Sequence, residues 1–428
     1  MRTDNTVETV FRIESARIIA SAARIVRDVG LAEEIAQDAL VEALEQWPRT
    51  GVPENPAAWL TTTARRRAVD LVRRRETYAR KLAVLGRDLD EAACDPEPAG
   101  PDDIDDDLLR LIFTACHPVL PPDARIALTL RLLGGLTTDE IARAFLAPEA
   151  TVAQRVVRAK RSLAKAGVPF EVPYGPERAK RLAGVLEVIY LIFNEGYSAT
   201  VGDDLIRPAL CEDALRLARQ LAALMPKEAE AHALAALLEI QASRTAARTD
   251  PEGRPVLLAD QRRSRWDQLL IRRGFAALTA AGALGGAPGP YALQAAIAAC
   301  HARARTYEET DWRAIAALYE RLAALVPSPV VELNRAVAVS MAEGPAAGLA
   351  VVDAVAEAPV LRAYHLLPSV RGDLLARLGR TAEARAEFTR AAELTRNARE
   401  RSLLLRRAEQ TGQTEQARQP GQTPRGTV

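Results

Sequence analysis

Residues 136–161 constrain the fold more than any other part of the sequence, because they predict two helices joined by a tight turn. Thr137 and Glu140 stand three positions apart ahead of an apolar run, which is the spacing of a capping box at a helix N-terminus. A second helix is expected to begin near Pro148, since proline is favoured in the first turn of a helix. The pattern indicates a helix-turn-helix.

The second of these helices has an apolar seam on one side and basic residues on the others. In a helix-turn-helix, the start of the second helix faces base edges in the major groove, and flanking cations lie along phosphates. We expect base-edge contacts from Glu149, Thr151, Gln154 and Arg155. We expect phosphate contacts from Arg158, Lys160, Arg161 and Lys165. The alternative is a helical hairpin with a solvated basic surface.

A second basic helix is predicted over residues 56–75, after a loop rich in proline and glycine. The helix ahead of that loop is expected to stop at Trp47 and Pro48. Trp59 belongs to the apolar side of the basic helix. The opposite side carries Thr62, Thr63, Arg66, Arg67, Arg73 and Arg74. Such a surface fits either nucleic-acid contact or simple solvation.

The whole chain is rich in Ala, Leu, Arg and Glu, which favours an all-α fold, and its 428 residues are enough for two to four compact units. The net charge of +1 conceals a segregated pattern. Cations dominate residues 65–81 and acids dominate residues 88–107. Residues 81–107 are therefore expected to form a solvated acidic linker. The alternative is a linker that occupies basic surfaces when nucleic acid is absent.

The C-terminal part, residues 177–410, is expected to form tetratricopeptide-like helical repeats. Residues 217–226 and 318–327 match closely, at a separation near three times the 34-residue repeat period. Small and aromatic residues that would let two helices of a repeat pack closely are Gly372, Leu375, Gly379, Ala384, Phe388 and Ala391. An ordinary helical bundle is the alternative, and residues 411–428 are predicted to be disordered.

Catalytic and metal sites are not expected. The four cysteines form no CxxC pair, the four histidines do not cluster, and the sequence has no HExxH, GxSxG or glycine-rich phosphate loop. Cys116 and His117 are expected to form the packed end of a helix. Because these motifs are missing, we expect a protein that is not an enzyme and needs no cofactor. No segment approaches a membrane span, so we expect the protein to be cytoplasmic.

Taken together, the two basic signals resemble the sigma-70 superfamily, and specifically the extracytoplasmic-function (ECF) sigma factors. Residues 11–75, with Trp47-Pro48 and the run Asn55-Pro-Ala-Ala-Trp-Leu60, look like sigma domain 2. The whole module that resembles sigma domain 2 is expected to span residues 1–80. Residues 108–168 look like sigma domain 4. The segments 190–198 and 260–267 are similar to the subgroup that carries a tetratricopeptide-like extension.

This resemblance implies a role for each module. The domain-2 helix would bind the β′ clamp helices of RNA polymerase core through Glu33, Glu34, Gln37, Asp38 and Glu42. The promoter −10 element would be read by Asn55, Trp59, Thr62, Thr63, Arg66, Arg67, Arg73 and Arg74. Domain 4 would read the −35 element and contact the β flap. The protein would associate with the nucleoid when bound to polymerase.

Two other functions stay open. A helix-turn-helix regulator that never binds polymerase core would not need the acidic helix that precedes the basic one. A repeat-based scaffold would use the C-terminal extension to bind a protein partner. We also hypothesise that the extension acts on the two DNA-binding modules of its own chain.

Overall fold

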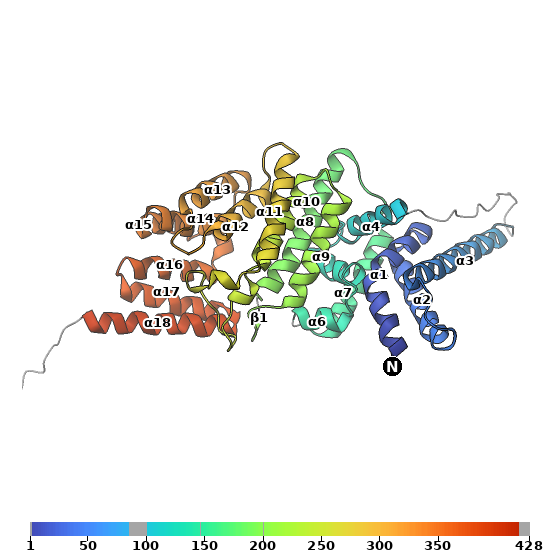
Figure 1. The fold of residues 1–428 in the computed structure, drawn as a ribbon, viewed down its shortest axis with the longest axis horizontal. Coiled ribbons are helices and arrows are strands. Elements are labelled where there is room, and N and C mark those ends of the chain that lie inside the picture. Colours follow the sequence, from blue (N-terminus) through green and yellow to red (C-terminus); the bar gives the residue numbers. More distant parts are fainter. Residues whose placement is uncertain (1, 85–100, 146, 200, 419–428) are drawn as a thin grey trace, which may run out of the picture. The chain divides into compact units, whose positions relative to one another are not determined.

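The structure is a computed structural model that describes residues 2–84, 101–145, 147–199 and 201–418. These residues form eighteen α-helices, four short 3-10 helices and one two-stranded parallel sheet (Figure 1). The all-α prediction is therefore confirmed. The chain divides into two compact units, whose boundary in the sequence falls between Ile192 and Phe193.

Three long helices begin the first unit: α1 (Arg2–Val26), α2 (Val29–Thr50) and α3 (Pro56–Val84). α1 packs against both α2 and α3, and Ile18, Trp47 and Leu60 are at most 2% exposed. The Asp28 carboxylate accepts hydrogen bonds from two backbone amides of the first turn of α2, at 2.7 and 3.0 Å. This N-cap satisfies donors that a helix start otherwise leaves unpaired.

The end of α2 differs from the prediction. The helix does not stop at Trp47 and Pro48 but continues to Thr50, with Gly51 as its C-cap. Gly51 has a φ of 87°, and its N–H donates to the Trp47 carbonyl at 3.0 Å. Pro48 lies in the last turn, and glycine adopts the positive φ that other residues avoid. The glycine, and not the proline, therefore ends the helix.

The first unit continues with shorter helices: α4 (Pro101–Ala115), α5 (Pro122–Leu132), α6 (Thr138–Phe145), α7 (Glu149–Lys165) and most of α8 (Gly175–Tyr197). α7 packs against α5 and α6, and Phe113, Leu128 and Leu130 are fully buried. Both ends of the predicted acidic linker are helical, because α3 runs to Val84 and α4 begins at Pro101. The middle of that linker, residues 85–100, lies outside the described residues.

The predicted helix-turn-helix is confirmed at its start. The backbone N–H of Glu140 donates to Oγ1 of Thr137 at 3.1 Å, and the N–H of Thr137 donates to Oε2 of Glu140 at 2.8 Å. This reciprocal pair is the expected capping box. Pro148 is the N-cap of α7, so the second helix begins at Glu149, close to the predicted position.

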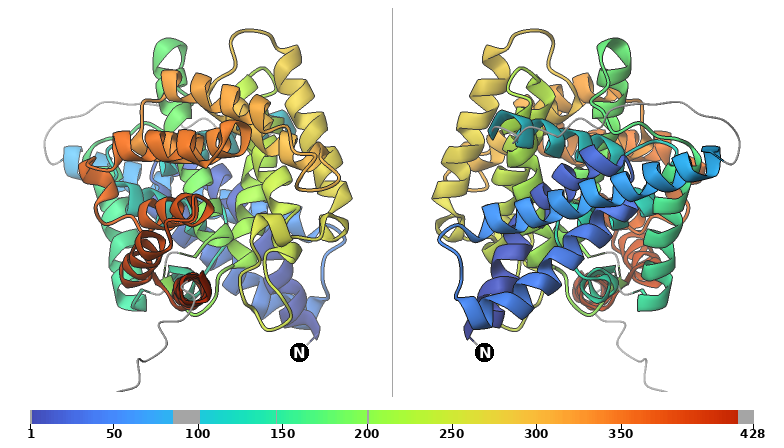
Figure 2. Two further views of the ribbon diagram at one scale, coloured as in Figure 1. Left: turned by 90° about the vertical axis from the view of Figure 1, so that its left-hand side faces the viewer. Right: turned by 90° about the vertical axis from the view of Figure 1, so that its right-hand side faces the viewer.

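The second unit contains the end of α8 and ten more α-helices. Its first helices are α9 (Pro208–Leu224), α10 (Ala229–Ala242), α11 (Gln268–Ala283), α12 (Pro290–Arg303) and α13 (Trp312–Leu325). They are followed by α14 (Pro329–Glu343), α15 (Pro345–Val355), α16 (Leu366–Arg377), α17 (Thr381–Leu394) and α18 (Ala398–Arg418). From α12 onward each helix packs on the next, and the left view of Figure 2 shows the orange-to-red helices stacked in this order.

The two matching sequence segments adopt the same local structure. Residues 217–226 end α9 and residues 318–327 end α13. In both, the last backbone N–H bonds to the carbonyl of a buried leucine: Met225 to Leu221 at 2.9 Å and Val326 to Leu322 at 2.8 Å. The sequence repeat therefore corresponds to a structural repeat at these helix ends.

Close packing of α16 on α17 follows the predicted pattern of small residues. A Cβ atom at Gly372 would lie 3.0 Å from the Phe388 ring, so no larger residue fits without a shift. Leu375, Ala384 and Ala391 are fully buried. The turn between the two helices contains Gly379, whose φ is 78°.

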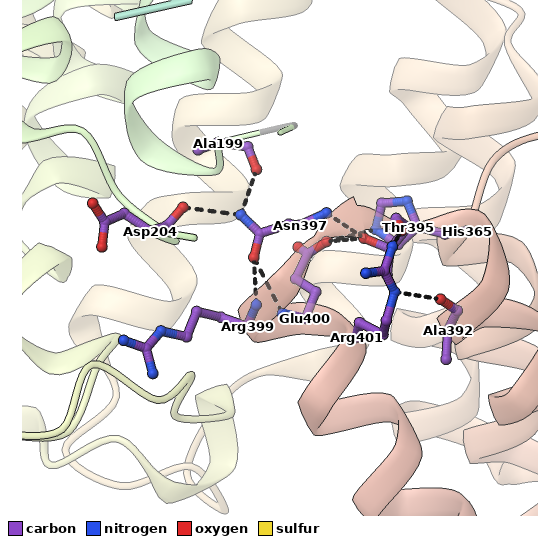
Figure 3. Close-up of polar contacts among 9 residues, drawn as sticks. All are labelled: Ala199, Asp204, His365, Ala392, Thr395, Asn397, Arg399, Glu400 and Arg401. Carbon is purple, nitrogen blue, oxygen red and sulfur yellow. Dashed lines mark hydrogen bonds and ion pairs between the residues drawn. The ribbon is translucent and has the colours of Figure 1, made fainter. Parts of the chain in front are cut away.

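The second unit is closed by contacts between its first and last segments. Strand β1 (Val201–Gly202) pairs with β2 (Arg396–Asn397), nearly 200 residues later. The buried Asn397 side chain donates to the carbonyls of Ala199 and Asp204 at 3.0 and 2.9 Å (Figure 3). α18 then continues to Arg418, so residues 411–418 are helical where the sequence predicted disorder. Residues 419–428 lie outside the described residues.

Candidate nucleic-acid interface

α7 presents a polar surface opposite its apolar seam. Val152, Val156 and Leu163 are buried against the first unit. Six of the eight residues predicted to contact DNA from this helix are exposed: Glu149, Thr151, Gln154, Arg158, Arg161 and Lys165. The start of the helix therefore offers polar side chains and its later turns offer exposed cations, as major-groove binding requires.

The other two predicted residues of α7 are engaged within the protein. Arg155 Nη2 lies 3.4 Å from Oδ2 of Asp123, which is itself 72% exposed. Lys160 forms an ion pair with Glu33 of α2. The Arg155 pair is solvent-exposed and worth little, whereas the Lys160 pair includes a buried carboxylate. Lys160 is therefore less available for a phosphate than its neighbours.

The exposed side of α3 carries the predicted −10 residues Thr62, Arg66, Arg73 and Arg74, and Thr63 is half-buried. Trp59 is half-buried, with its ring 5.4 Å from that of Trp47 in an edge-to-face arrangement. Asn55 serves as the N-cap of α3, because its Oδ1 accepts a hydrogen bond from the N–H of Ala58 at 3.0 Å. Four of the predicted −10 residues are thus exposed on α3, and Asn55 also has a structural role.

Arg67 links the predicted DNA-binding helix to the predicted polymerase-binding helix. Its Nε and Nη2 donate to Oε2 of Glu42 at 3.1 and 2.8 Å, and its Nη1 lies 3.3 Å from Oδ2 of Asp38. Glu34, Gln37 and Asp38 are exposed on α2. The acidic surface therefore remains accessible around this bridge.

Glu33 does not belong to that acidic surface, because it is only 5% exposed. Its Oε1 accepts from Nε of Arg131 in α5 at 2.6 Å, and its Oε2 pairs with Lys160 in α7. Gln37 also donates to Oε1 at 3.2 Å. A residue predicted to bind polymerase thus ties α2, in the first predicted module, to α5 and α7, in the second. No local pattern predicts this contact, since Arg131 lies 98 residues away in the chain.

A second buried carboxylate joins the same two modules. Asp107, in the segment predicted to be a solvated linker, is fully buried. It pairs with Arg24 of α1 at 3.4 Å and with Arg110 of α4 at 2.6 Å. Burial raises the pKa of Asp107, and the two arginines act in the opposite direction. The linker prediction was wrong here because it treated every acid in a charged run as solvated.

Metal and membrane sites are absent from the part of the chain that the structure describes. No group of three His, Cys, Asp or Glu side chains there could hold a metal ion. Cys116 is packed at the end of α4, 3.4 Å from Oγ1 of Thr129, and burial raises its pKa to about 11. None of the described helices is long and apolar enough to cross a membrane.

Three family models match separate parts of the chain. Sigma-70 region 2 matches residues 11–77, and sigma-70 region 4 matches residues 110–163. A family of unknown function, DUF6596, matches residues 181–282. The first two matches cover the helices that carry the basic surfaces, and the third covers the first helices of the extension.

Individual relatives agree with these matches. An uncharacterized protein of Rhizobium meliloti, R00370, is 47% identical over 386 residues, which cover 89% of this chain and 90% of the relative. The ECF RNA polymerase sigma factor SigK of Mycobacterium tuberculosis H37Rv is 31% identical over 154 residues, which are 35% of this chain and 78% of SigK. SigK of Mycobacterium ulcerans is 30% identical over 155 residues and is also covered over 78% of its length. The chain therefore belongs to the ECF RNA polymerase sigma factors of the sigma-70 family and carries a long helical extension behind its two sigma regions.

Proposed function

We propose that this sigma factor binds RNA polymerase core and directs initiation at promoters whose −35 and −10 elements it recognises. The observation that carries the proposal is the exposed surface of α7, where polar residues at the helix start precede cations in later turns. A second basic helix, α3, supplies a separate DNA-binding surface in the other sigma region. Two such surfaces suit two elements of one promoter.

At the −35 element, Glu149, Thr151 and Gln154 would face base edges, while Arg158, Arg161 and Lys165 would lie along phosphates. Arg155 would join the base-edge group by leaving Asp123. Its exposed ion pair is of the kind that contributes at most about 1 kcal/mol. A contact with DNA would therefore replace it at small cost.

At the −10 element, the cations of α3 would hold the DNA backbone, and Trp59 beside Trp47 would offer an aromatic surface to an unpaired base. A sigma factor stores no covalent energy. It opens DNA by binding the unpaired strand more tightly than the duplex, against a cost of about 1.4 kcal/mol per base-pair step. The exposed Arg66, Arg73 and Arg74 would hold the backbone of either form, so the preference for the unpaired strand would come from base contacts such as that of Trp59.

The polymerase would contact α2 through the exposed residues Glu34, Gln37 and Asp38, with Glu42 at the edge. The β′ clamp helices and β flap are the partner surfaces that membership of the family suggests. Glu33 could contribute only if domain 2 separated from Arg131 and Lys160. Docking through the other acids does not require that separation.

The extension would modulate this activity from within the chain, as a surface for polymerase or for another protein. SigK is matched over 78% of its length by only 35% of this chain, so the two sigma regions correspond to most of a sigma factor of that kind. The remaining helices are additional. Deleting everything after Ile192, where the first unit ends, and measuring promoter-dependent transcription tests this part. Unchanged activity and regulation would refute it.

The direct test is co-purification with core polymerase followed by in vitro transcription on fragments of the source genome. The proposal expects a stable complex and a discrete set of start sites that share two upstream sequences. DNA binding without polymerase would instead indicate a helix-turn-helix regulator. Neither activity would indicate a protein-interaction scaffold.

A further inference from the structure

A cavity of about 620 Å³ lies inside the first unit, lined by the turn between α1 and α2, by α4 and by the end of α7. Small-molecule pockets in proteins span about 300 to 1,000 Å³, so this cavity has room for a ligand. Two of its lining residues, Val29 and Leu163, are buried, whereas Arg27, Pro169 and Glu171 are exposed. The cavity therefore opens to solvent beside these exposed residues.

The chain after α7 forms an apolar wall of the cavity. Gly167 has a φ of 58°, and the N–H of Val168 donates to the Leu163 carbonyl at 3.2 Å. This is a Schellman motif, in which a glycine in the left-handed region ends the helix and redirects the chain. Beyond this turn, Val168, Pro169 and Phe170 join Leu163 in lining the cavity. An aromatic or aliphatic part of a ligand would contact these side chains.

The cavity is also lined by four cations, Arg24, Arg27, Arg110 and Lys160. Three of them are neutralised within the protein. Arg24 and Arg110 pair with the buried Asp107 at 3.4 and 2.6 Å, and Lys160 pairs with the buried Glu33. Arg27 differs from them, because its guanidinium has no ion pair and no hydrogen bond within the described part of the chain.

The acids that line the cavity do not neutralise Arg27. Oδ1 of Asp28 accepts from the backbone amides of Gly30 and Leu31 at the start of α2. Glu171 is exposed. Neither acid pairs with Arg27, although all three residues line the same cavity. A guanidinium with five N–H donors is therefore available to an anion from outside the chain.

The backbone of Arg27 adopts a conformation that disfavours arginine. Its φ is 52°, and no other residue besides glycine has a positive φ in the described part of the chain. Left-handed conformations are costly for residues with a Cβ atom, and they gather at functional sites. Glycine would form the same turn between α1 and α2 with less strain. The turn itself thus gives no reason for an arginine, whereas a ligand in the cavity would.

We propose that this cavity binds a small amphipathic anion, with its phosphate or carboxylate on Arg27 and its apolar part against Val168 and Phe170. A guanidinium binds both oxygens of such a group through paired N–H donors. Arg27 belongs to the first sigma region, and Phe170 follows the helix-turn-helix of the second. A bound ligand would therefore touch both regions and favour their contact. Binding needs neither polymerase nor DNA, so the site does not depend on the proposed function.

Isothermal titration of the full-length protein with phenyl phosphate and with benzoate, at constant ionic strength, tests the proposal. The two probes distinguish recognition of a phosphate from recognition of a carboxylate. We expect saturable binding of at least one of them. That probe should bind about tenfold or more tightly than its counterpart without the ring, inorganic phosphate or acetate, because the ring buries apolar surface against the wall.

Arg27→Gly removes the guanidinium and keeps the turn, because glycine adopts a φ of 52° without strain. Its affinity for the aromatic probe should fall about tenfold or more, while its Tm stays unchanged or rises. Arg49→Gln is the matched control. Arg49 is an exposed arginine in the last turn of α2 and does not line the cavity, so this variant should bind the probe as the wild type does.

Three results would overturn the proposal. The first is the absence of saturable binding of both aromatic probes up to about 10 mM, where a site of millimolar affinity would be filled. The second is equal affinity in the wild type and Arg27→Gly, and the third is equal affinity for a probe with and without its ring. If Arg27→Gly does not fold, hydrogen exchange of the wild type decides. The bound probe should slow exchange in residues 25–31 and 164–171, and unchanged exchange there refutes the site.

Discussion

Asn397 holds the first and last segments of the extension together, and its replacement should destabilise the second unit strongly. Its Nδ2 donates to the carbonyls of Ala199 and Asp204, and its Oδ1 accepts from the amides of Arg399 and Glu400 at 3.0 and 3.2 Å (Figure 3). Asn397→Ala leaves two carbonyls without their donor and removes the cap of α18. At roughly 1 to 2 kcal/mol for each orphaned group and about 1 kcal/mol for the cap, the loss is about 3 to 5 kcal/mol.

Thermal unfolding of the full chain measures this loss. The Tm of a unit of this size falls by roughly 2 to 4 °C for each kcal/mol of lost stability. The Tm of the extension should therefore fall by about 10 °C. Hydrogen exchange should accelerate in residues 197–206 and 395–402. Ser402→Ala is the control, because its hydroxyl makes one exposed bond to the Ala398 carbonyl in the same helix. An Asn397→Ala shift no larger than that of Ser402→Ala would refute the reasoning.

Three further predictions concern single side chains of the two units. Glu33→Gln should lower the free energy of unfolding of the first unit by roughly 3 to 5 kcal/mol, because it leaves two cations without their buried partner. Urea unfolding measures the change, and the exposed Glu34→Gln should stay within about 0.5 kcal/mol of the wild type. Lys165→Ala should lower the salt slope of promoter binding by about one, and an unchanged slope would contradict its phosphate contact. Burial raises the pKa of Cys211 from 9.0 to about 12, so the folded state holds its proton longer than the unfolded state. The protonated Cys211 thiol should therefore contribute fully to the free energy of unfolding below pH 9. Above pH 9 this contribution should fall by up to roughly 1.4 kcal/mol per pH unit. Unfolding of Cys211→Ala, followed on both sides of pH 9, should show a flatter pH dependence.

Features encoded by neighbouring residues were predictable from the sequence. The capping box of α6 and the apolar seam of α7 depend on residues three or four positions apart, and both are present. The close approach at Gly372 follows from a repeat pattern in the same way. The first two depend on helix geometry alone, whereas the contact of Gly372 in α16 with Phe388 in α17 follows from the repeat pattern.

Contacts between distant residues were not predictable in the same way. Glu33 and Asp107 are acids in charged surroundings, and only tertiary packing brings arginines from other helices against them. Asn397 is one polar residue among many, and its partner Ala199 lies 198 residues away. The spacing of residues along the chain carries no information about such pairs. The tertiary fold, and not the helical repeat of the local sequence, decides which helix surfaces contact each other.

Site-specific photocrosslinking within the polymerase complex tests the central claim most directly. A photoreactive residue at the exposed position of Gln154 in α7, and another at Thr62 in α3, would report which promoter segment each helix contacts. We expect Gln154 to crosslink to the −35 element and Thr62 to the −10 element of the same promoter, and only when core polymerase is present. Crosslinking of both positions to one segment, or equal crosslinking without polymerase, would contradict it.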